Sequence, residues 1–412
     1  MSKKILFVAY HYLPITHSSG VHRTLAFTRY LAEWGHDVSV LTTVCKAYPN
    51  YDIEQIKDIP PAVKVVRAWA KDATRDFAYK GKHLQFMSIP DRYQTWIIGG
   101  VISGLKAIRA NRPEVIISTF PVASAHVIGY ILHKITGIPW VTDFRDPMAQ
   151  DGYPSVPILH KSFRWIENKV FAHASEIIFV TDGAKKVYEE RFPDFPRDRI
   201  HVIPNGYDEK MFGSIPLKSV EQSDSVKNQK FNLIHSGIIY PSDRDPSHLF
   251  IALKQLKDEG KVSEDNFVLT LRGCQNDSLF IPQISALGIG DIVKFASSIP
   301  YKEAIVEMAN ADGLLILQAV SCNNQIPAKA YEYLRLSKPV IALTDPCGET
   351  GKLIIKSKAG LVVALDDVKG ICRSIEELLA KRAGVNNASL DVIKSYSREA
   401  SAKMLESLFE KI

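Results

Sequence analysis

The sequence has few cysteines and no group of them arranged to hold a metal or a disulfide framework. Its 412 residues include five cysteines, at positions 45, 274, 322, 347 and 372, with no Cys-x-x-Cys pair. An odd number of scattered cysteines, without histidines at zinc-ligand spacing, excludes a disulfide scaffold and a zinc-binding module. We therefore expect reduced thiols and a cytoplasmic protein.

Long apolar runs are also scarce. The run Ile5 to Ala9 is too short for a signal-peptide core, so we expect no export. Residues 115–133 lack Asp, Glu, Lys and Arg, and a stretch of that length is typical of a transmembrane helix. Because Ser118, Pro121 and His126 interrupt it, we expect a buried strand followed by a helix rather than a membrane span.

Charge of one sign is only slightly in excess. Lysine and arginine outnumber the acids by 51 − 45 = 6, and the isoelectric point is about 8.8. This balance suits a phosphate-bearing ligand or an anionic membrane surface, and we expect no nucleic-acid partner. With 46% hydrophobic and 23% charged residues, the composition is that of a globular protein with material for two cores.

Two common ligand motifs are missing. No Gly-x-Gly-x-x-Gly follows the first predicted strand, which argues against a dinucleotide-dependent dehydrogenase. Asp143 and Asp146 are spaced Asp-x-x-Asp rather than Asp-x-Asp, a spacing that does not indicate a divalent metal. We therefore expect neither a metal nor a cofactor.

Short β-branched runs instead alternate with helical periods along almost the whole chain. These continuously apolar runs are typical of parallel strands buried on both faces. We predict strands near residues 4–9, 37–43, 63–69, 115–119, 140–143, 176–181, 201–204, 231–236, 267–272, 292–296, 313–317, 339–343 and 361–364.

This pattern predicts an α/β protein with two Rossmann-like, doubly wound domains facing a central cleft. The expected domains are residues 1–210 and 211–388, with the polar segment 214–230 as a loop or linker. A single final helix is expected over about 389–411, in a tail 389–412 that packs back on the first domain. Ligands of such sheets bind beyond the carboxyl ends of the strands, where the candidate residues lie.

Two such loops belong to the first domain. Ser19 and Gly20 begin a helix predicted over residues 20–34, where free backbone N–H groups suit a phosphate, or where Ser19 is a plain N-cap. Asp143, Arg145 and Asp146 follow the fifth strand. They are suited to orient sugar hydroxyls, to hold a phosphate, or to form an internal Arg–Asp clamp.

The second domain offers a cationic set. Gly237 ends its first strand, and Arg244 precedes the next helix, either facing a diphosphate or solvated in its loop. Lys329 and Glu332 share one face of a helix that begins near Pro327. There a lysine can bind phosphate and a carboxylate can accept ribose hydroxyls, unless the two form an exposed ion pair.

The order and spacing of these motifs resemble the retaining glycosyltransferases of the GT-B fold, family 4 (glycosyl transferases group 1), which use nucleotide-activated sugars. The resemblance covers nearly the full length. It is carried by Pro14, Ser19 and Gly20 and by segments 31–38, 143–147, 202–208, 235–237 and 327–334.

The resemblance implies roles for individual residues. Gly20 lines the donor phosphate, Arg244 faces the diphosphate and Glu332 binds the ribose; the donor-binding set also includes Ser19, Gly237, Asn324 and Lys329. Asn324 stands where many relatives carry a glutamate that touches the transferred sugar, and Asp143 where they often carry a histidine. A lysine that usually follows the arginine is missing after Arg244, and Lys329 is expected to supply that charge.

The expected reaction is hexosyl transfer (EC 2.4) from a nucleotide-sugar to a glycan or lipid-linked acceptor, with retention of configuration. Negative charge grows on the leaving phosphate, so Arg244 and Lys329 are the catalytic cations we expect. Asp143 is the candidate nucleophile of a double displacement. The resemblance implies front-face transfer without a metal instead. Nucleotide-sugar epimerase, sugar phosphorylase and non-catalytic nucleotide binding stay as alternatives.

By the resemblance the acceptor lies with the first domain, where we assign Arg145 and Asp146 to the acceptor side. The family usually works at the inner membrane face, so a peripheral contact with that face is a further expectation. Residues 89–98 mix aromatic, basic and apolar side chains. They are read either as a membrane-surface helix or as an amphipathic helix packed on its own sheet.

Overall fold

The structure is a computed structural model that describes residues 2–16, 20–80, 83–213, 215 and 230–412. The chain divides into two compact units. The first comprises residues 1–204 and 398–412, and the second comprises residues 205–397. The predicted loop 214–230 lies outside the described residues except for Ile215 and Lys230.

The first unit is built on a seven-stranded parallel sheet of order β3-β2-β1-β4-β5-β6-β7. Its strands are β1 Lys4–Val8, β2 Asp37–Thr43, β3 Lys64–Ala68, β4 Val115–Thr119, β5 Trp140–Arg145, β6 Glu176–Phe179 and β7 Ile200–Val202. Its helices are α1 Gly20–Glu33, α2 Ala73–Asp76, α3 Thr95–Asn111, α4 Ser124–Thr136, α5 Pro157–His173, α6 Asp182–Arg191 and α14 Arg398–Leu408.

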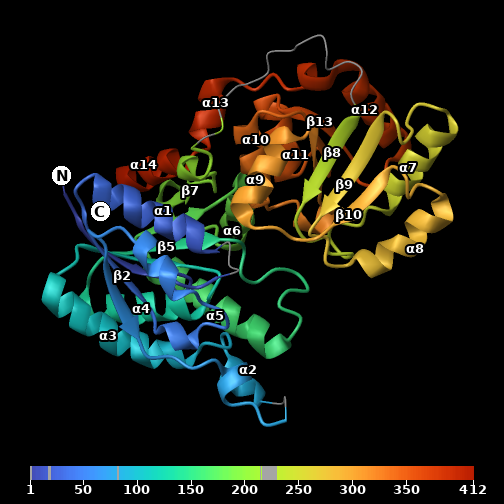
Figure 1. The fold of residues 1–412 in the computed structure, drawn as a ribbon. Coiled ribbons are helices and arrows are strands. Elements are labelled where there is room, and N and C mark those ends of the chain that lie inside the picture. The colour runs from blue at the N-terminus through green and yellow to red at the C-terminus, as the bar shows by residue number, and fades with distance from the viewer. Residues whose placement is uncertain (1, 17–19, 81–82, 214, 216–229) are drawn as a thin grey trace. The chain divides into compact units, whose positions relative to one another are not determined.

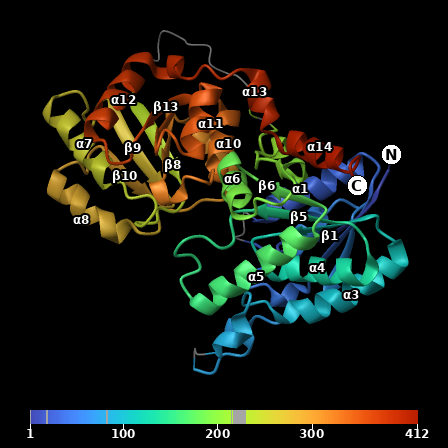
Figure 2. The ribbon, with the colours of Figure 1, turned by 180° about the vertical axis from the view of Figure 1, so that it is seen from behind.

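Helices cover both faces of this sheet, as Figure 1 shows. Ile5 and Phe7 on β1 belong to a core cluster with α1 and α14, whereas Leu6 and Val8 face a cluster with α3, α4 and α5. Figure 2 shows these last three helices side by side. The alternation of side chains along a strand therefore feeds two separate cores, which explains why the strands read as continuously apolar.

The second unit repeats the plan with a six-stranded parallel sheet of order β10-β9-β8-β11-β12-β13. Its strands are β8 Phe231–Ser236, β9 Phe267–Arg272, β10 Val293–Ala296, β11 Gly313–Leu317, β12 Val340–Leu343 and β13 Gly360–Val363. Its helices are α7 Ser247–Asp258, α8 Asp277–Leu287, α9 Tyr301–Asn310, α10 Ala328–Leu336, α11 Glu349–Ser357, α12 Val368–Lys381 and α13 Leu390–Ser395. One core lies under α7, α8 and α12 and the other under α9, α10 and α11.

The predicted fold class is confirmed, and every predicted strand is present with ends within two residues of the prediction, whereas the single final helix is wrong. β6 and β7 each end two residues earlier than predicted. β5 runs two residues further than predicted, to Arg145, where the sheet register shifts and Arg145 has a positive φ of 58°. The single final helix is broken into α13 and α14, because the backbone of Ser397 forms a bridge to Tyr207 instead of continuing the helix.

The tail after this break belongs to the first unit. Ala402 and Leu405 of α14 lie in the same core cluster as Phe27 and Leu31 of α1. The Ser401 hydroxyl donates to the Pro204 carbonyl at 2.9 Å. Apolar packing holds the tail on the helix that begins at Gly20, and the polar contact joins it to the segment after β7.

In the described part of the chain, no helix combines the length and the apolar character needed to cross a bilayer. Residues 115–133 form β4 and most of α4, as the interrupted pattern predicts. Residues 89–98 include the start of α3, and Tyr93 and Trp96 are buried in the core of the first unit. For residues 89–98 the structure therefore favours an amphipathic helix packed on its own sheet over a membrane-surface helix.

Candidate functional site

Each sheet has one place where its strand order reverses. In the first unit the loops after β1 and β4 lead away from each other, and in the second unit the loops after β8 and β11 do so. Ligands of open α/β sheets bind beyond the carboxyl ends of the strands at such a point. The predicted site residues gather at these two edges.

At the carboxyl edge of the first unit, Asp143 is buried and fully engaged. Arg23 of α1 binds it in a bidentate manner, with Nε to Oδ2 and Nη2 to Oδ1 both at 3.1 Å. Thr119 of β4 donates its hydroxyl to Oδ2 at 3.0 Å. Burial raises the pKa of Asp143, but Arg23 and Arg145 outweigh burial and hold the pKa below its usual value. Asp143 is therefore a buried carboxylate in an ion pair.

Arg145 is buried beside this pair and fixes the start of α1. Its Nη1 donates to the Gly20 carbonyl at 2.7 Å and its Nη2 to the Thr24 hydroxyl at 2.8 Å. Its Nε lies 3.7 Å from Asp143 Oδ2. The internal Arg–Asp clamp considered from the sequence is thus present, with Arg23 as its stronger cation. Contact of Arg145 with an acceptor stays a prediction that this inward geometry does not favour.

Of the other residues predicted for this edge, the structure describes Asp146 and Gly20. Asp146 is partly exposed next to Arg145, and burial raises the pKa of its carboxyl group. Ser19 lies outside the described residues, so its predicted role is not placed. Gly20 begins α1 as predicted, and its contact with a donor phosphate stays a prediction.

At the carboxyl edge of the second unit, the ammonium group of Lys329 lies close to Gly237. Lys329 is in the first turn of α10, which follows β11, and Gly237 follows β8. Gly237 has φ of 123°, and a Cβ built on it would lie 3.2 Å from Lys329 Nζ. A side chain at residue 237 would therefore both strain the backbone and crowd the ammonium group.

Lys329 has one hydrogen-bond partner in the described part of the chain. Its Nζ lies 3.1 Å from Nε2 of His235, a fully buried residue of β8. Burial and the nearby charge of Arg244 lower the pKa of Lys329 to about 7, which Glu332 opposes. The exposed Lys329–Glu332 ion pair considered from the sequence does not form among these residues.

Arg244 and Glu332 complete the set. Arg244 Nη1 donates to the Ile238 carbonyl at 2.7 Å, and its guanidinium stacks 5.3 Å from the centre of the Tyr240 ring. Glu332, one turn after Lys329, accepts a hydrogen bond from the Tyr301 hydroxyl at 2.5 Å. Asn324 lies partly exposed in the loop between β11 and α10.

The second edge can bind a diphosphate. Two cations and the N-terminus of α10 offer N–H donors, and Glu332 offers a carboxylate oxygen to hydroxyl groups. The sequence singled out Gly237, Arg244, Lys329 and Glu332 as site residues. His235 belongs to segment 235–237, which carries the resemblance, but it was given no role, and Tyr301 was missed. Their contacts with Lys329 and Glu332 span 94 and 31 residues, and the sequence carries no sign of them.

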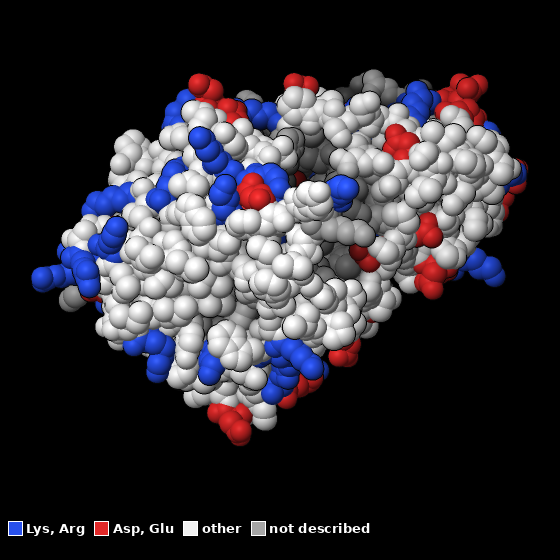
Figure 3. Space-filling model, turned by 90° about the horizontal axis from the view of Figure 1, so that it is seen from below, with Lys and Arg blue, Asp and Glu red and all other residues white. Residues whose placement is uncertain are grey.

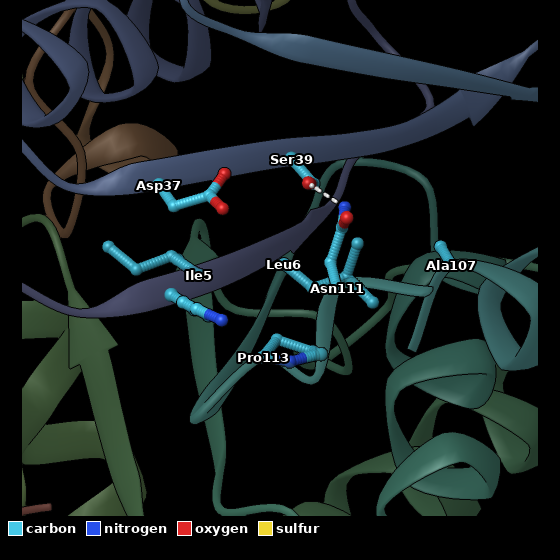
Figure 4. Close-up of a pocket in the computed structure, with 8 residues that line it drawn as sticks. Ile5, Leu6, Asp37, Ser39, Ala107, Asn111 and Pro113 are labelled. Carbon is cyan, nitrogen blue, oxygen red and sulfur yellow. Dashed lines mark hydrogen bonds between the residues drawn. The ribbon is translucent and has the colours of Figure 1, made fainter. Parts of the chain in front are cut away.

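Other surface features lie away from these two edges. A small hollow at the amino ends of β1 and β2 is spanned by the hydrogen bond from Asn111 Nδ2 to Ser39 Oγ at 3.0 Å (Figure 4). It lies at the end of the strands opposite to the candidate residues. Figure 3 shows lysines and arginines scattered among acidic and uncharged side chains, without a continuous basic area on the face it draws.

A metal site is not indicated within the part of the chain that the structure describes. No group of three or more His, Cys, Asp or Glu side chains there is placed to hold an ion. No disulfide joins any two of the five cysteines, all of which lie in the described ranges.

Comparison with protein families gives two matches that follow each other along the chain. Residues 20–206 match the model described as glycosyl transferase 4-like domain. Residues 221–399 match the model described as glycosyl transferases group 1. A comparison with curated proteins gives no match.

Solved structures share the fold over nearly the whole length at low sequence identity. Sucrose-phosphate synthase from Thermosynechococcus elongatus is 14% identical, with a TM-score of 0.67 over 99% of this chain and 98% of that chain. Anabaena HepE in complex with UDP is 15% identical, with a TM-score of 0.68 over 99% and 100%. The N-terminal domain of trehalose-6-phosphate phosphatase from Candida albicans is 12% identical, with a TM-score of 0.70 over 100% and 97%.

Proposed function

This chain belongs to the group 1 glycosyltransferases of the GT-B fold, and on that premise we propose that the carboxyl edge of its second unit binds the nucleotide-sugar donor. The observation that carries the proposal is the placement of Lys329 next to Gly237, where the strand order reverses, with Arg244 and Glu332 close enough to act on the Lys329 charge. The bound UDP in the HepE structure supports a nucleoside diphosphate as the ligand.

In this proposal each residue meets one part of the donor. Lys329 and Arg244 donate hydrogen bonds to the diphosphate, since both have donor groups left over after their contacts with His235 and Ile238. Glu332 accepts from the ribose hydroxyls while the Tyr301 hydroxyl holds one of its oxygens. Asn324 lies just before the start of α10, and we assign it to the transferred sugar.

The same cations promote the reaction. As the bond from the sugar to the phosphate breaks, the sugar gains oxocarbenium character and negative charge grows on the leaving diphosphate. Lys329 and Arg244 stabilise that growing charge. We propose that they do so without a divalent metal and without a cofactor, because two side-chain cations serve the diphosphate from the protein itself.

We propose retention of configuration by front-face transfer. A double displacement needs a carboxylate that is free to attack the sugar, as in retaining glycosidases. Arg23 and Thr119 engage both oxygens of Asp143, so this candidate nucleophile is poorly suited to attack. In front-face transfer the leaving phosphate takes the acceptor proton, and no protein nucleophile is needed.

The acceptor we propose is a glycan or a lipid-linked precursor. For a lipid-linked acceptor, the first unit has three exposed apolar side chains near α2, since Tyr79, Leu84 and Phe86 are between 62% and 77% exposed. Lys80 follows Tyr79 directly. Such a combination suits a peripheral contact with an anionic membrane face.

A thermal-shift screen tests the donor site. We expect at least one of the UDP-, GDP-, ADP- and dTDP-sugars to raise the melting temperature, because a ligand that binds only the folded state stabilises it. Glu332→Ala should abolish the shift, whereas Glu349→Ala, on α11 of the same unit, should keep it. A chain that responds to no nucleotide-sugar contradicts the proposal.

A second assay separates transfer from binding alone. With the stabilising donor and a crude lipid and glycan pool, we expect a sugar-bearing product whose anomeric configuration, read by NMR, matches that of the donor. Epimerised donor or phosphate-dependent sugar phosphate would instead identify an epimerase or a phosphorylase. Binding without any product would identify a non-catalytic nucleotide-binding protein.

A further inference from the structure

His235 is a buried imidazole directly behind the proposed diphosphate site. It lies on β8 with no exposed surface, between the β11 backbone and the α10 side chain of Lys329. Its role is not explained by apolar packing, because both of its ring nitrogens face polar groups.

The two contacts fix which nitrogen carries the proton. Nδ1 lies 3.0 Å from the Leu315 carbonyl oxygen, which only accepts hydrogen bonds, so Nδ1 must be the donor. Burial and the charge of Lys329 lower the pKa of His235 well below its usual value, so the ring is neutral. Nε2 therefore has a free lone pair, and it faces Lys329 Nζ at 3.1 Å.

Resting on the proposed donor site, we propose that His235 is a positioning residue. Its Nε2 accepts one hydrogen from Lys329 and so directs the other Nζ hydrogens of this lysine toward the donor diphosphate. The lysine side chain is long and flexible, and holding it costs conformational entropy. An acceptor fixed on a central strand keeps the cation over Gly237 before the donor arrives.

The charged and titratable neighbours agree with this role. Arg244 and Lys329 repel each other, while Glu332 attracts Lys329 from one turn along α10. Tyr333 is buried beside them, and burial raises the pKa of its hydroxyl. Without His235, the ammonium group of Lys329 would keep the repulsion of Arg244 and the attraction of Glu332 but would lose its one hydrogen bond in the described part of the chain. The neutral His235 ring thus holds the Lys329 ammonium group without neutralising it, so its positive charge stays available to the donor diphosphate.

Two substitutions separate positioning from structural support. His235→Gln places a side-chain oxygen near the position of Nε2 and keeps an acceptor for Lys329. His235→Asn places its amide near the position of Nδ1, keeps a donor for Leu315 and loses the acceptor. Calorimetric titration with UDP, GDP, ADP and dTDP, together with the melting temperature, is measured for both variants and for the wild type.

We expect His235→Asn to raise the Kd of the nucleotide that the wild type binds by about tenfold, and His235→Gln to stay within about threefold of the wild type. In a Lys329→Met background, His235→Asn should change the Kd no further. Equal Kd values for His235→Asn and the wild type, or equal weakening by both variants, would overturn the inference.

A measurement on the wild-type protein covers the case in which a variant does not fold. In a protein labelled with ¹⁵N-histidine, we expect the His235 ring to carry its proton on Nδ1 across pH 6 to 8. A proton on Nε2 would contradict the inference. If the wild type binds none of the four nucleotides, the proposed donor site fails, while the tautomer still reports on the Lys329 contact by itself.

Discussion

The carboxyl edges of the two sheets use charge in opposite ways. In the first unit, Arg23, Asp143 and Arg145 are buried, both arginines pair with Asp143, and both also donate to nearby carbonyl groups. In the second unit, Lys329 is held by a neutral imidazole and Arg244 by a single carbonyl. The topology is the same, but the cations of the first edge bond a carboxylate directly, whereas among the described residues neither Lys329 nor Arg244 forms an ion pair.

This difference shows that a charged residue at the end of a parallel strand does not by itself mark a ligand site. What matters is whether its counter-charge is already supplied by the protein. A buried carboxylate that is bound in a bidentate manner, such as Asp143, contributes to the fold, and removing it leaves Arg23 and Arg145 buried without their carboxylate counter-charge. Lys329 has no carboxylate bonded to it among the described residues, and we propose that the donor diphosphate supplies its counter-charge.

The largest effect should come from breaking the network of the first unit. Asp143→Ala leaves Arg23 and Arg145 without their carboxylate, so we expect a loss of about 3–5 kcal/mol in the free energy of unfolding of this unit. All five tryptophans lie between residues 34 and 165, so tryptophan fluorescence in urea reports on the first unit. Arg244→Met, in the second unit, should leave this transition unchanged, and a stable Asp143→Ala would break the comparison.

The second-largest effect, on nucleotide affinity, is expected at Lys329 of the second unit. We expect Lys329→Met to raise the Kd of the bound nucleoside diphosphate about 10- to 100-fold, the range for a lost hydrogen bond to a charged group. The melting temperature should not fall, because a buried cation is removed. Lys352→Met, at an exposed lysine of the same unit, serves as the control for calorimetry. An unchanged Kd would show that the second edge is not the donor site.

The pH dependence of donor affinity tests the same role of Lys329. Burial and Arg244 lower the pKa of Lys329 to about 7, so the residue is cationic below this pH and neutral above it. Affinity for a nucleotide-sugar, whose diphosphate diester does not titrate near neutral pH, should therefore fall as pH rises, by up to about tenfold per unit above pH 7. Calorimetry across pH 6 to 9 measures this slope. A slope that persists in Lys329→Met would assign it to another group.

The smallest effect on nucleotide affinity is expected at the Glu332 carboxylate. Tyr301→Phe removes the hydroxyl that donates to Glu332, and loss of one hydrogen bond should raise the nucleotide Kd about three- to fivefold. The matched control is Tyr240→Phe, since Arg244 contacts the ring of Tyr240. Equal titration curves for Tyr301→Phe and the wild type would mean that Glu332 needs no such support.

The fold was predictable because its strands are buried on both faces. Gly313–Leu317, for example, is a short apolar run between Asp312 and Gln318, so its limits follow from the sequence. The end of β5 and the break before α14 depend on contacts with other segments. Arg145 leaves the regular strand geometry to reach Gly20, and Ser397 pairs with Tyr207.

The site was predictable only in part, for a related reason. Gly237, Arg244, Lys329 and Glu332 follow strands or begin helices, and position along the chain is enough to single them out. Whether a charge is free depends on partners that are distant in sequence. Arg23 reaches Asp143 across 120 residues, and no local pattern distinguishes Asp143 from a ligand-binding carboxylate.

A crystal structure with the nucleoside diphosphate that stabilises the protein would test the central claim most directly. The account predicts diphosphate oxygens within about 3 Å of Lys329 Nζ and of the Arg244 guanidinium, with the Arg23–Asp143 pair intact. A diphosphate bound elsewhere, with Lys329 still bonded only to His235, would contradict it.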